Sequence, residues 1–295
     1  MIRPTLRQLE YLISLDNEKS FSKAATYCNV TQSTLSAGIK DLEDILAQQL
    51  VNRAGRTITL TALGSDIADK ARKILGDVDT VIARANQMQT PLSGTLRLGV
   101  IPTIAPYFLP NILPYLQDEF PALELQLYED LSARLVEQLH KRQIDAALIA
   151  FPYDTEGLET HDLFEEPFYM AAPKHKDLPK GISIKDIKPE ELLLLEDGHC
   201  LREHALSACK LQLPSQRKTF SATSLATLIQ MVGHGYGITL LPEMVVKYAP
   251  MPDTIALIPF KNPQPKRQIG IAWDNNHPQK RDLLELLGAL RDFLA

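Results

Sequence analysis

The first part of the chain takes its fold from one stretch, Ser20-Phe-Ser-Lys-Ala-Ala-Thr-Tyr-Cys-Asn-Val-Thr-Gln-Ser-Thr-Leu-Ser-Ala-Gly-Ile-Lys-Asp-Leu-Glu-Asp-Ile-Leu46. Ser22 is a candidate N-cap for a short helix that ends near Cys28 and Asn29, and Thr31 is a candidate N-cap for a longer one. Apolar residues then recur at helical spacing along the longer helix, at Leu35, Ile39, Leu42 and Leu46. Two helices joined by so short a turn predict a helix-turn-helix.

The opposite face of the longer helix is polar. Its first turns carry small polar side chains and then a lysine, namely Gln32, Ser33, Thr34, Ser36 and Lys40. Such an N-terminal end suits the major groove of DNA. A solvated helix in a three-helix bundle would show the same face, and an apolar stripe from Leu6 to Leu15 predicts the third helix of that bundle.

A hairpin is predicted next, from Leu50 to Leu60, with a polar turn between two runs that favour strands. Arg53 and Arg56 lie at its tip, where they would meet phosphate or the minor groove. Two arginines on a turn are usually only solvated, but beside a helix-turn-helix they form a wing.

The segment from Thr61 to Met88 predicts one long helix. Its apolar residues repeat in steps of four and three, at Leu63, Ile67, Ala71, Ile74, Val78, Val81, Ala85 and Met88. This spacing is typical of a coiled coil, and the helix is too long to pack wholly against the small domain before it. We therefore expect it to pair with a second chain, which would present two recognition helices to two DNA half-sites.

The composition is that of a globular protein with room for two domains. The 295 residues are 45% hydrophobic and 23% charged, with a net charge of -5. Residues 1–90 hold 11 Lys+Arg and 10 Asp+Glu, so the N-terminal part is the less acidic one.

No apolar run reaches the roughly 18 residues of a membrane span, and the N-terminus lacks the apolar core of a signal peptide, so we expect a cytoplasmic protein. Three cysteines do not make a disulfide scaffold.

The remainder of the chain, after the breaker-rich Thr90-Pro-Leu-Ser-Gly94, predicts an α/β domain. Strands are expected at 96–101, 123–128 and 144–150, with helices at 106–120 and 132–140 between them. These strands alternate with helices, which predicts a parallel α/β arrangement. Further segments are expected at 168–172, 192–195, 218–221, 238–241, 255–259 and 268–273, before a last helix at 280–294.

A cysteine-containing stretch, Glu196 to Lys210, departs from an ordinary soluble protein. Cys200 follows His199, with Arg202 and His204 close by, so we expect a lowered thiol pKa. Cys209 is nine positions on, and a helix between the two would separate them by roughly 13 Å, too far for a disulfide unless the helix refolds. Two unrelated thiols remain an alternative. A metal site at His199, Cys200, His204 and Cys209 is a weaker one.

Several motifs resemble the LysR-type transcriptional regulators. They are Leu6-Arg-Gln-Leu-Glu-Tyr-Leu12, Ser20-Phe-Ser-Lys-Ala-Ala25, Thr31-Gln-Ser-Thr-Leu-Ser36, Leu42-Glu43, Arg53 and Leu60-Thr-Ala-Leu-Gly64. The resemblance implies a winged helix-turn-helix DNA-binding domain at 1–60, a coiled-coil linker helix for dimerisation at 61–89, and an effector domain at 90–295. That effector domain would be α/β and similar to periplasmic solute-binding proteins, with one subdomain at about 90–165 and 268–295 and the other at about 166–267.

Within that family, Leu195-Glu-Asp-Gly-His-Cys-Leu-Arg-Glu203 and Phe220-Ser-Ala-Thr-Ser-Leu225 resemble the peroxide-sensing members. The resemblance implies that Cys200 reacts with peroxide and that Cys209 resolves the product as a disulfide. It also implies a peroxide-binding set of Thr103, Ser132, His199 and Arg267. Ser132 stands where a threonine is common, and Glu203 where an aspartate is.

The resemblance also implies partners. They are double-stranded DNA, a homodimer or homotetramer, hydrogen peroxide as effector, RNA polymerase, and a glutaredoxin or thioredoxin that resets the switch. No cofactor, metal or membrane is expected. One rival hypothesis is a regulator that binds a small metabolite between its subdomains. The other is a thiol peroxidase, an enzyme that would have no use for Gln32 or Arg53.

Overall fold

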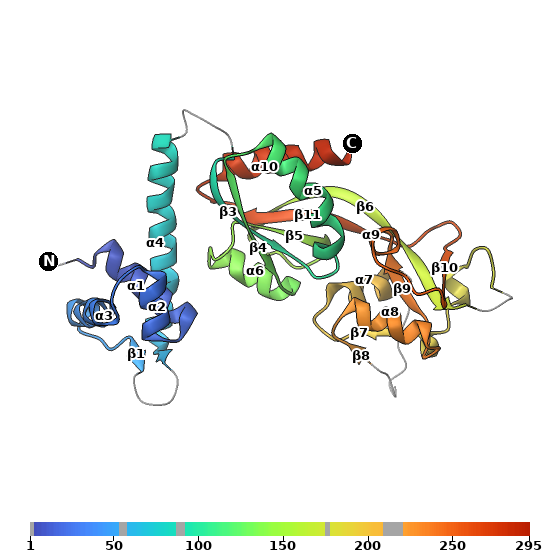
Figure 1. Ribbon diagram of the computed structural model, residues 1–295, viewed down its shortest axis with the longest axis horizontal. Coiled ribbons are helices and arrows are strands. Elements are labelled where there is room, and N and C mark those ends of the chain that lie inside the picture. Colours follow the sequence, from blue (N-terminus) through green and yellow to red (C-terminus); the bar gives the residue numbers. More distant parts are fainter. Residues whose placement is uncertain (1–2, 53–57, 87–91, 175–177, 209–220) are drawn as a thin grey trace. The chain divides into compact units, whose positions relative to one another are not determined.

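The computed structural model describes residues 3–52, 58–86, 92–174, 178–208 and 221–295. The chain divides into two compact units (Figure 1), one formed by Met1–Gln89 with Lys141–Gln143 and the other by Thr90–His140 with Ile144–Ala295. Over the described residues, no helix has the length and hydropathy needed to cross a membrane.

The first unit is a helical bundle with a small two-stranded sheet. Its elements are α1 (Leu6–Glu18), α2 (Phe21–Tyr27), α3 (Gln32–Leu46), β1 (Val51–Asn52), β2 (Thr59–Leu60) and α4 (Ala62–Asn86). The apolar stripes of α1 and α3 face each other, because Leu12, Leu15, Leu35, Ile39 and Leu42 are all fully buried. A Cβ on Gly38 would come within 2.7 Å of the Tyr11 ring, so the close approach of α3 to α1 needs a glycine there.

The helix starts of this unit confirm one predicted cap and correct another. Thr31 is the N-cap of α3, since its hydroxyl accepts the Thr34 amide at 3.2 Å. The N-cap of α2 is Ser20 and not Ser22. Ser22 lies inside α2, where its hydroxyl donates to Gln32 Oε1 at 2.8 Å. This contact between the two helices could not be read from the spacing of the serines. Arg53 and Arg56, predicted at the hairpin tip, lie outside the described residues.

The long helix α4 confirms the predicted element and has two kinds of face. Ala68 and Ala71 are buried against the bundle. The placement of Ala71 in the coiled-coil seam was therefore wrong, because its side chain is part of the core of this unit. Arg72 is also buried and forms ion pairs with Asp16 and Asp69, both at 2.6 Å. The apolar side chains of the other face remain exposed within this unit, at 41% for Leu63, 44% for Ile74 and 68% for Val81. An exposed apolar row of this kind is what a coiled-coil seam requires.

The second unit is organised around one large mixed sheet. Its strands run in the order β10 (Ile255–Pro259), β6 (Leu158–Pro173), β11 (Lys266–Asp274), β5 (Ala146–Phe151), β3 (Gly94–Val100) and β4 (Leu123–Glu129), and β9 (Thr239–Pro242) also pairs with β6. Within the described residues of this sheet, the pairs β3–β4 and β3–β5 are parallel, and the pairs that involve β6 and β11 are antiparallel. The parallel arrangement predicted for 96–101, 123–128 and 144–150 is therefore confirmed. The crossover helices fix the direction of β3, β4 and β5, whereas β6 and β11 are joined through the intervening residues 174–265 and run antiparallel to each other.

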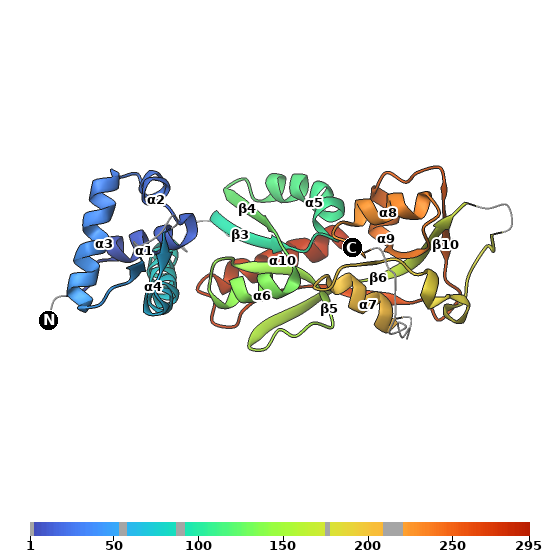
Figure 2. The ribbon, with the colours of Figure 1, turned by 90° about the horizontal axis from the view of Figure 1, so that it is seen from below.

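Helices cover both faces of the part of this sheet that contains β3, β4 and β5, which we call the near half. α5 (Ala105–Glu119) packs with α10 (Lys280–Leu294), and α6 (Ser132–His140) packs against β5 and β11. The far half holds β7 (Leu194–Leu195), β8 (Ser221–Ala222), α7 (Cys200–Ala208), α8 (Leu225–Gly233), α9 (Glu243–Tyr248) and the 3-10 turns η1 (Ile184–Asp186) and η2 (Pro189–Glu191). Figure 2 shows β6 and β11 running from one half to the other. β6 and β11 therefore belong to both halves of the unit.

Candidate functional site

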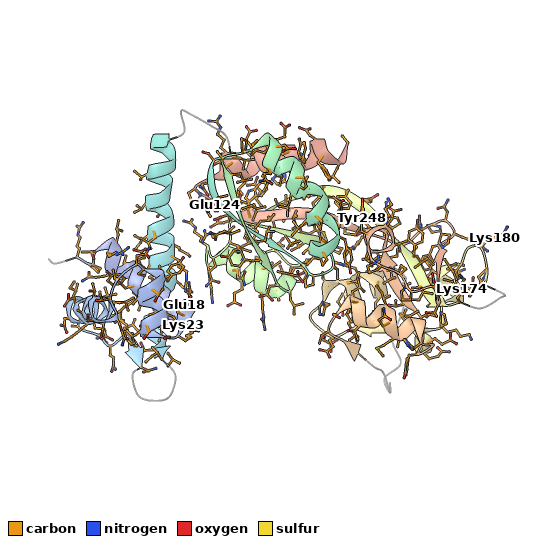
Figure 3. The ribbon with its side chains drawn as sticks, in the orientation of Figure 1. Glu18, Lys23, Glu124, Lys174, Lys180 and Tyr248 are labelled. Carbon is orange, nitrogen blue, oxygen red and sulfur yellow. The ribbon has the colours of Figure 1, made fainter. Side chains whose placement is uncertain are left out.

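The polar end of α3 is exposed, as a DNA-reading surface requires. Gln32, Ser33, Thr34 and Lys40 are exposed and Ser36 is half-buried. Thr31 anchors this turn, because its hydroxyl lies 2.9 Å from that of Ser33 and 2.7 Å from that of Thr34. Lys23 on α2, which Figure 3 labels, adds an exposed cation to the helix that contacts α3. Sequence reasoning had not singled out Lys23, and its position within the Ser20–Ala25 motif was the available signal.

Around Cys200, three segments that are far apart in the sequence come together. Thr103 follows β3, Ser132 is the first residue of α6, and Cys200 is the first residue of α7. All three line one small cavity, whose lining is Ile101, Pro102, Thr103, Leu131, Ser132, His199 and Cys200. The cavity has no space that a water molecule could occupy. A bound molecule would therefore have to displace its walls.

Arg267 approaches this cavity through Thr103. Its Nη1 donates to Thr103 Oγ1 at 3.0 Å and its Nη2 donates to the Thr103 carbonyl at 3.2 Å. On the other side of the guanidinium, Nε and Nη2 both lie 2.8 Å from Glu166 Oε2. The Arg267 side chain is completely buried and Glu166 is nearly so. Sequence reasoning had found Arg267 but not Glu166, which lies 101 positions away in the chain.

The Cys200 thiol is less acidic than the sequence indicated. Burial raises its pKa, and the hydroxyl of Ser132, the charge of Arg267 and the amides at the start of α7 offset this only in part. The expected stabilising cations are engaged elsewhere. Arg202 pairs with Asp197 at 3.0 Å and donates to the Leu195 carbonyl at 3.2 Å. The prediction of a lowered thiol pKa was therefore wrong, because desolvation of the thiolate outweighs the nearby positive charge.

Both histidines near the thiol are neutral. Burial lowers the pKa of half-buried His199 and of buried His204. His204 Nε2 lies 2.9 Å from the Pro152 carbonyl and must donate to it, which leaves Nδ1 as an acceptor. Among the described residues Nδ1 has no hydrogen-bond partner. His204 therefore fastens α7 to the segment after β5.

Ser132 and Glu203, two residues named from the sequence, lie in different surroundings. The buried Ser132 hydroxyl has no hydrogen-bond partner within the described part of the chain and faces the Cys200 cavity. The Glu203 side chain is 75% exposed and lies 3.9 Å from Arg202, away from the cavity lining. Cys209 lies outside the described residues, and the two described cysteines, Cys28 and Cys200, are free. The described residues contain no cluster of His, Cys, Asp and Glu that would hold a metal ion.

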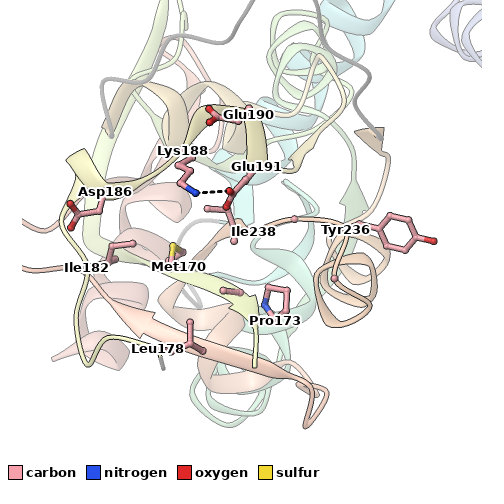
Figure 4. Close-up of a pocket in the computed structure, with 13 residues that line it drawn as sticks. Met170, Pro173, Leu178, Ile182, Asp186, Lys188, Glu190, Glu191, Tyr236 and Ile238 are labelled. Carbon is pink, nitrogen blue, oxygen red and sulfur yellow. Dashed lines mark hydrogen bonds and ion pairs between the residues drawn. The ribbon is translucent and has the colours of Figure 1, made fainter. Parts of the chain in front are cut away.

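A second, larger cavity lies elsewhere in the far half of the unit. It has a volume of about 460 Å³, and its walls come from β6, the η1 and η2 turns and the loop before β9. Figure 4 shows its apolar floor at Met170 and Ile182 and the Lys188–Glu191 ion pair at its rim. None of the predicted site residues lines it.

Comparison with known proteins gives concordant results for both units. Residues 6–65 match the bacterial regulatory helix-turn-helix protein, lysR family, and residues 89–295 match the LysR substrate binding domain. EstR of Acinetobacter baylyi, an HTH-type transcriptional regulator, is 41% identical over 244 residues, which cover 82% of this chain and 81% of that protein. The hydrogen peroxide-inducible genes activator of Dickeya chrysanthemi is 36% identical over 293 residues, which cover 98% and 95%.

A solved structure extends the similarity to the whole fold. A full-length OxyR variant from Pseudomonas aeruginosa matches with a TM-score of 0.83 and 33% identity, covering 99% of this chain and 96% of that one. The chain therefore belongs to the LysR family of DNA-binding transcriptional regulators, not to a family of enzymes, and is related over its full length to the OxyR hydrogen peroxide-inducible activators.

Proposed function

We propose that this protein is a transcriptional regulator of peroxide-response genes that is switched by oxidation of Cys200. The observation that carries the proposal is the small cavity at Cys200, which is lined by the thiol together with Thr103, Ser132 and His199. The cavity has no room for a metabolite, and its hydroxyls and thiol offer hydrogen-bonding groups that suit a molecule of two oxygen atoms once the walls move to admit it. Within the described residues the Ser132 hydroxyl has no partner at hydrogen-bond geometry, so it would gain a hydrogen bond from such a molecule.

The chemistry balances with these groups alone. The Cys200 thiolate attacks one oxygen of hydrogen peroxide, the O–O bond breaks, and the departing hydroxide takes up a proton to become water. Donors at Thr103 and Arg267 would stabilise the charge that develops on the departing oxygen. The resulting sulfenic acid condenses with a second thiol, proposed to be Cys209, forming a disulfide and releasing a second water.

The second step requires α7 to unfold. α7 begins at Cys200 and continues to Ala208. A helix of that length holds its ends roughly 12 Å apart, whereas a disulfide needs Cα atoms within about 7 Å. Formation of the disulfide must therefore break the His204 contact with Pro152 and repack the far half of the unit. A change of that size can be transmitted to a subunit interface.

The remaining roles follow the same division of the chain. We propose that residues 1–60 bind operator DNA, that the linker helix at 61–89 dimerises, and that residues 90–295 sense peroxide. A homotetramer, contact with RNA polymerase, and reset by glutaredoxin or thioredoxin belong to the same proposal.

Three cysteine variants test the switch. Cys200→Ser should bind operator DNA and show no change of footprint with one equivalent of peroxide. Cys209→Ser should form a sulfenic acid that a dimedone probe traps. Cys28→Ser is the matched control, because Cys28 is equally buried but lies in the first unit, where it donates to Ser14 Oγ at 3.1 Å. A normal peroxide footprint from Cys200→Ser would refute the proposal.

A second candidate function is regulation by a small metabolite. The 460 Å³ cavity favours it, since that volume falls in the range of ligand pockets. The cavity is formed by residues 170–238 alone, so it does not lie between the expected subdomains. An unchanged peroxide response in Cys200→Ser would support this candidate in place of the first.

A further inference from the structure

A buried ion pair of Glu166 and Arg267 lies beside Thr103 of the Cys200 cavity, and the proposed switch uses only Arg267 of the two. The positive charge of Arg267 would stabilise a thiolate at Cys200. Yet its Nε and Nη2 are bound by Glu166 Oε2, and the side chains of both residues are at most 3% exposed. An arginine compensated in this way acts on its surroundings as a dipole, and not as a full positive charge.

The positive end of that dipole lies on the side of Thr103. Arg267 Nη1 faces Thr103, which lines the cavity together with Cys200, whereas Glu166 lies on the opposite side of the guanidinium. Glu166 is itself held in place, because its second oxygen, Oε1, accepts the Met244 amide at the start of α9 at 2.7 Å. The carboxylate is therefore a fixed part of the fold.

We propose that Glu166 is a positioning residue that sets the reactivity of Cys200 by neutralising Arg267 while holding its guanidinium against Thr103. The proposal rests on the proposed function of Cys200 for its biological meaning. Its only physical requirement is that the charges of Glu166 and Arg267 change the pKa of the Cys200 thiol. On this proposal Glu166 favours the protonated form of the resting thiol and so lowers its reactivity.

Other groups around the thiol do not supply this control. His199 and His204 on the α7 segment are neutral because burial lowers the pKa of each. Tyr153, after β5, is also uncharged near neutral pH, because burial raises its pKa. Ser132 on α6 and Thr103 after β3 carry no charge. The pair on β6 and β11 is therefore the charged element among these neighbours, and the charge of Arg267 acts on the Cys200 thiol.

A charge cycle on the full-length protein tests the proposal. The rate at which iodoacetamide alkylates Cys200 is followed against pH, with peptide mass spectrometry to distinguish Cys200 from Cys28 and Cys209. Glu166→Gln leaves one uncompensated positive charge and should lower the pKa of the Cys200 thiol by roughly one unit, with an alkylation rate at pH 7 about tenfold higher. Arg267→Gln leaves a negative charge and should raise that pKa.

The double variant Glu166→Gln with Arg267→Gln decides between charge and packing. The double variant has no net charge at the pair, so the pKa of its Cys200 thiol should return toward that of the wild type. If the single variants acted through lost packing, the double variant should deviate from the wild type further than either of them. If Glu166→Gln does not fold, the thiol pKa of Arg267→Gln is compared with that of the double variant. The proposal then expects the lower pKa in the double variant. The matched control is Glu165→Gln, because Glu165 is the neighbouring carboxylate and forms an exposed pair with Lys266.

The outcomes are distinct. A thiol pKa that is unchanged or raised in Glu166→Gln, or one that fails to return toward the wild-type value when Arg267→Gln is added, would overturn the proposal. Because alkylation needs neither peroxide nor DNA, a failure here is distinguishable from a failure of the peroxide switch itself.

Discussion

Asp145 provides a prediction whose size can be worked out from the structure. This carboxylate is 3% exposed and precedes β5. It accepts the Arg97 amide at 2.7 Å, Arg97 Nε at 3.1 Å, Arg97 Nη2 at 2.6 Å and His277 Nε2 at 3.2 Å. Burial alone would raise its pKa, but the hydrogen bonds from His277 and Arg97 outweigh burial and lower it from 3.8 to about 2. Asp145 therefore joins β3, the start of β5 and the segment before α10.

The sign of the effect on stability follows from linkage. The folded-state pKa of Asp145 lies below the unfolded value, so its contribution is fully present above about pH 4 and is lost as the pH falls toward 2. A shift of this size corresponds to about 2 kcal/mol of unfolding free energy at neutral pH. Asp145→Asn preserves the side-chain volume but removes the charge, so it should lose at least that amount, because it also leaves the buried His277 without a charged acceptor.

Trp273 reports on this change. It is the only tryptophan of the chain, lies in β11 and is fully buried, so its fluorescence follows unfolding of the second unit. In urea at pH 7, a loss of about 2 kcal/mol should lower the midpoint of the Asp145→Asn variant by roughly 1 M. Exposed Asp253→Asn is the matched control and should leave the midpoint unchanged. The reasoning fails if Asp145→Asn unfolds like the wild type at pH 7, or if the difference between them does not narrow at pH 3.

The remaining predictions concern DNA binding, assembly and acid sensitivity. Gln32→Ala should reduce discrimination between operator and random DNA by roughly 1 to 3 kcal/mol, whereas Arg53→Ala should weaken both alike and flatten the salt dependence, and equal losses of discrimination in fluorescence anisotropy would count against these roles. Ile74→Asp should dissociate the dimer, since the proposed seam would bury the new charge, and an unchanged mass in sedimentation would show that α4 packs elsewhere. The lowered pKa of buried His204 means that the unfolded state takes up protons first, so the stabilisation by the neutral imidazole is present above about pH 6.5 and is lost below it. His204→Gln should therefore be less sensitive to acid than the wild type between pH 7 and 5 in Trp273-monitored unfolding, and an identical pH profile would contradict the assignment.

Local features of the fold could be predicted from the sequence because their causes are local. The N-cap Thr31 and the apolar spacing of α3 act within one or two turns, so they define the helix without reference to the rest of the chain. The same holds for the four-three spacing of α4. The helix from Cys200 to Ala208 could also be expected from its helix-forming residues, and with it the distance between the two cysteine positions. The motifs, in turn, identified the family.

Other features were decided only by the tertiary structure. The direction of β6 and β11 depends on how the far half of the unit connects them, so helix and strand alternation could not predict it. The acidity of Cys200 depends on its burial and on which cations remain near it, and the nearby Arg202 proved to be paired with Asp197. Glu166 reaches Arg267 across 101 positions, and no sequence signal joined them. Burial and charge pairing arise from residues that meet only when the sheet forms, whereas capping and periodicity act between neighbours in the chain.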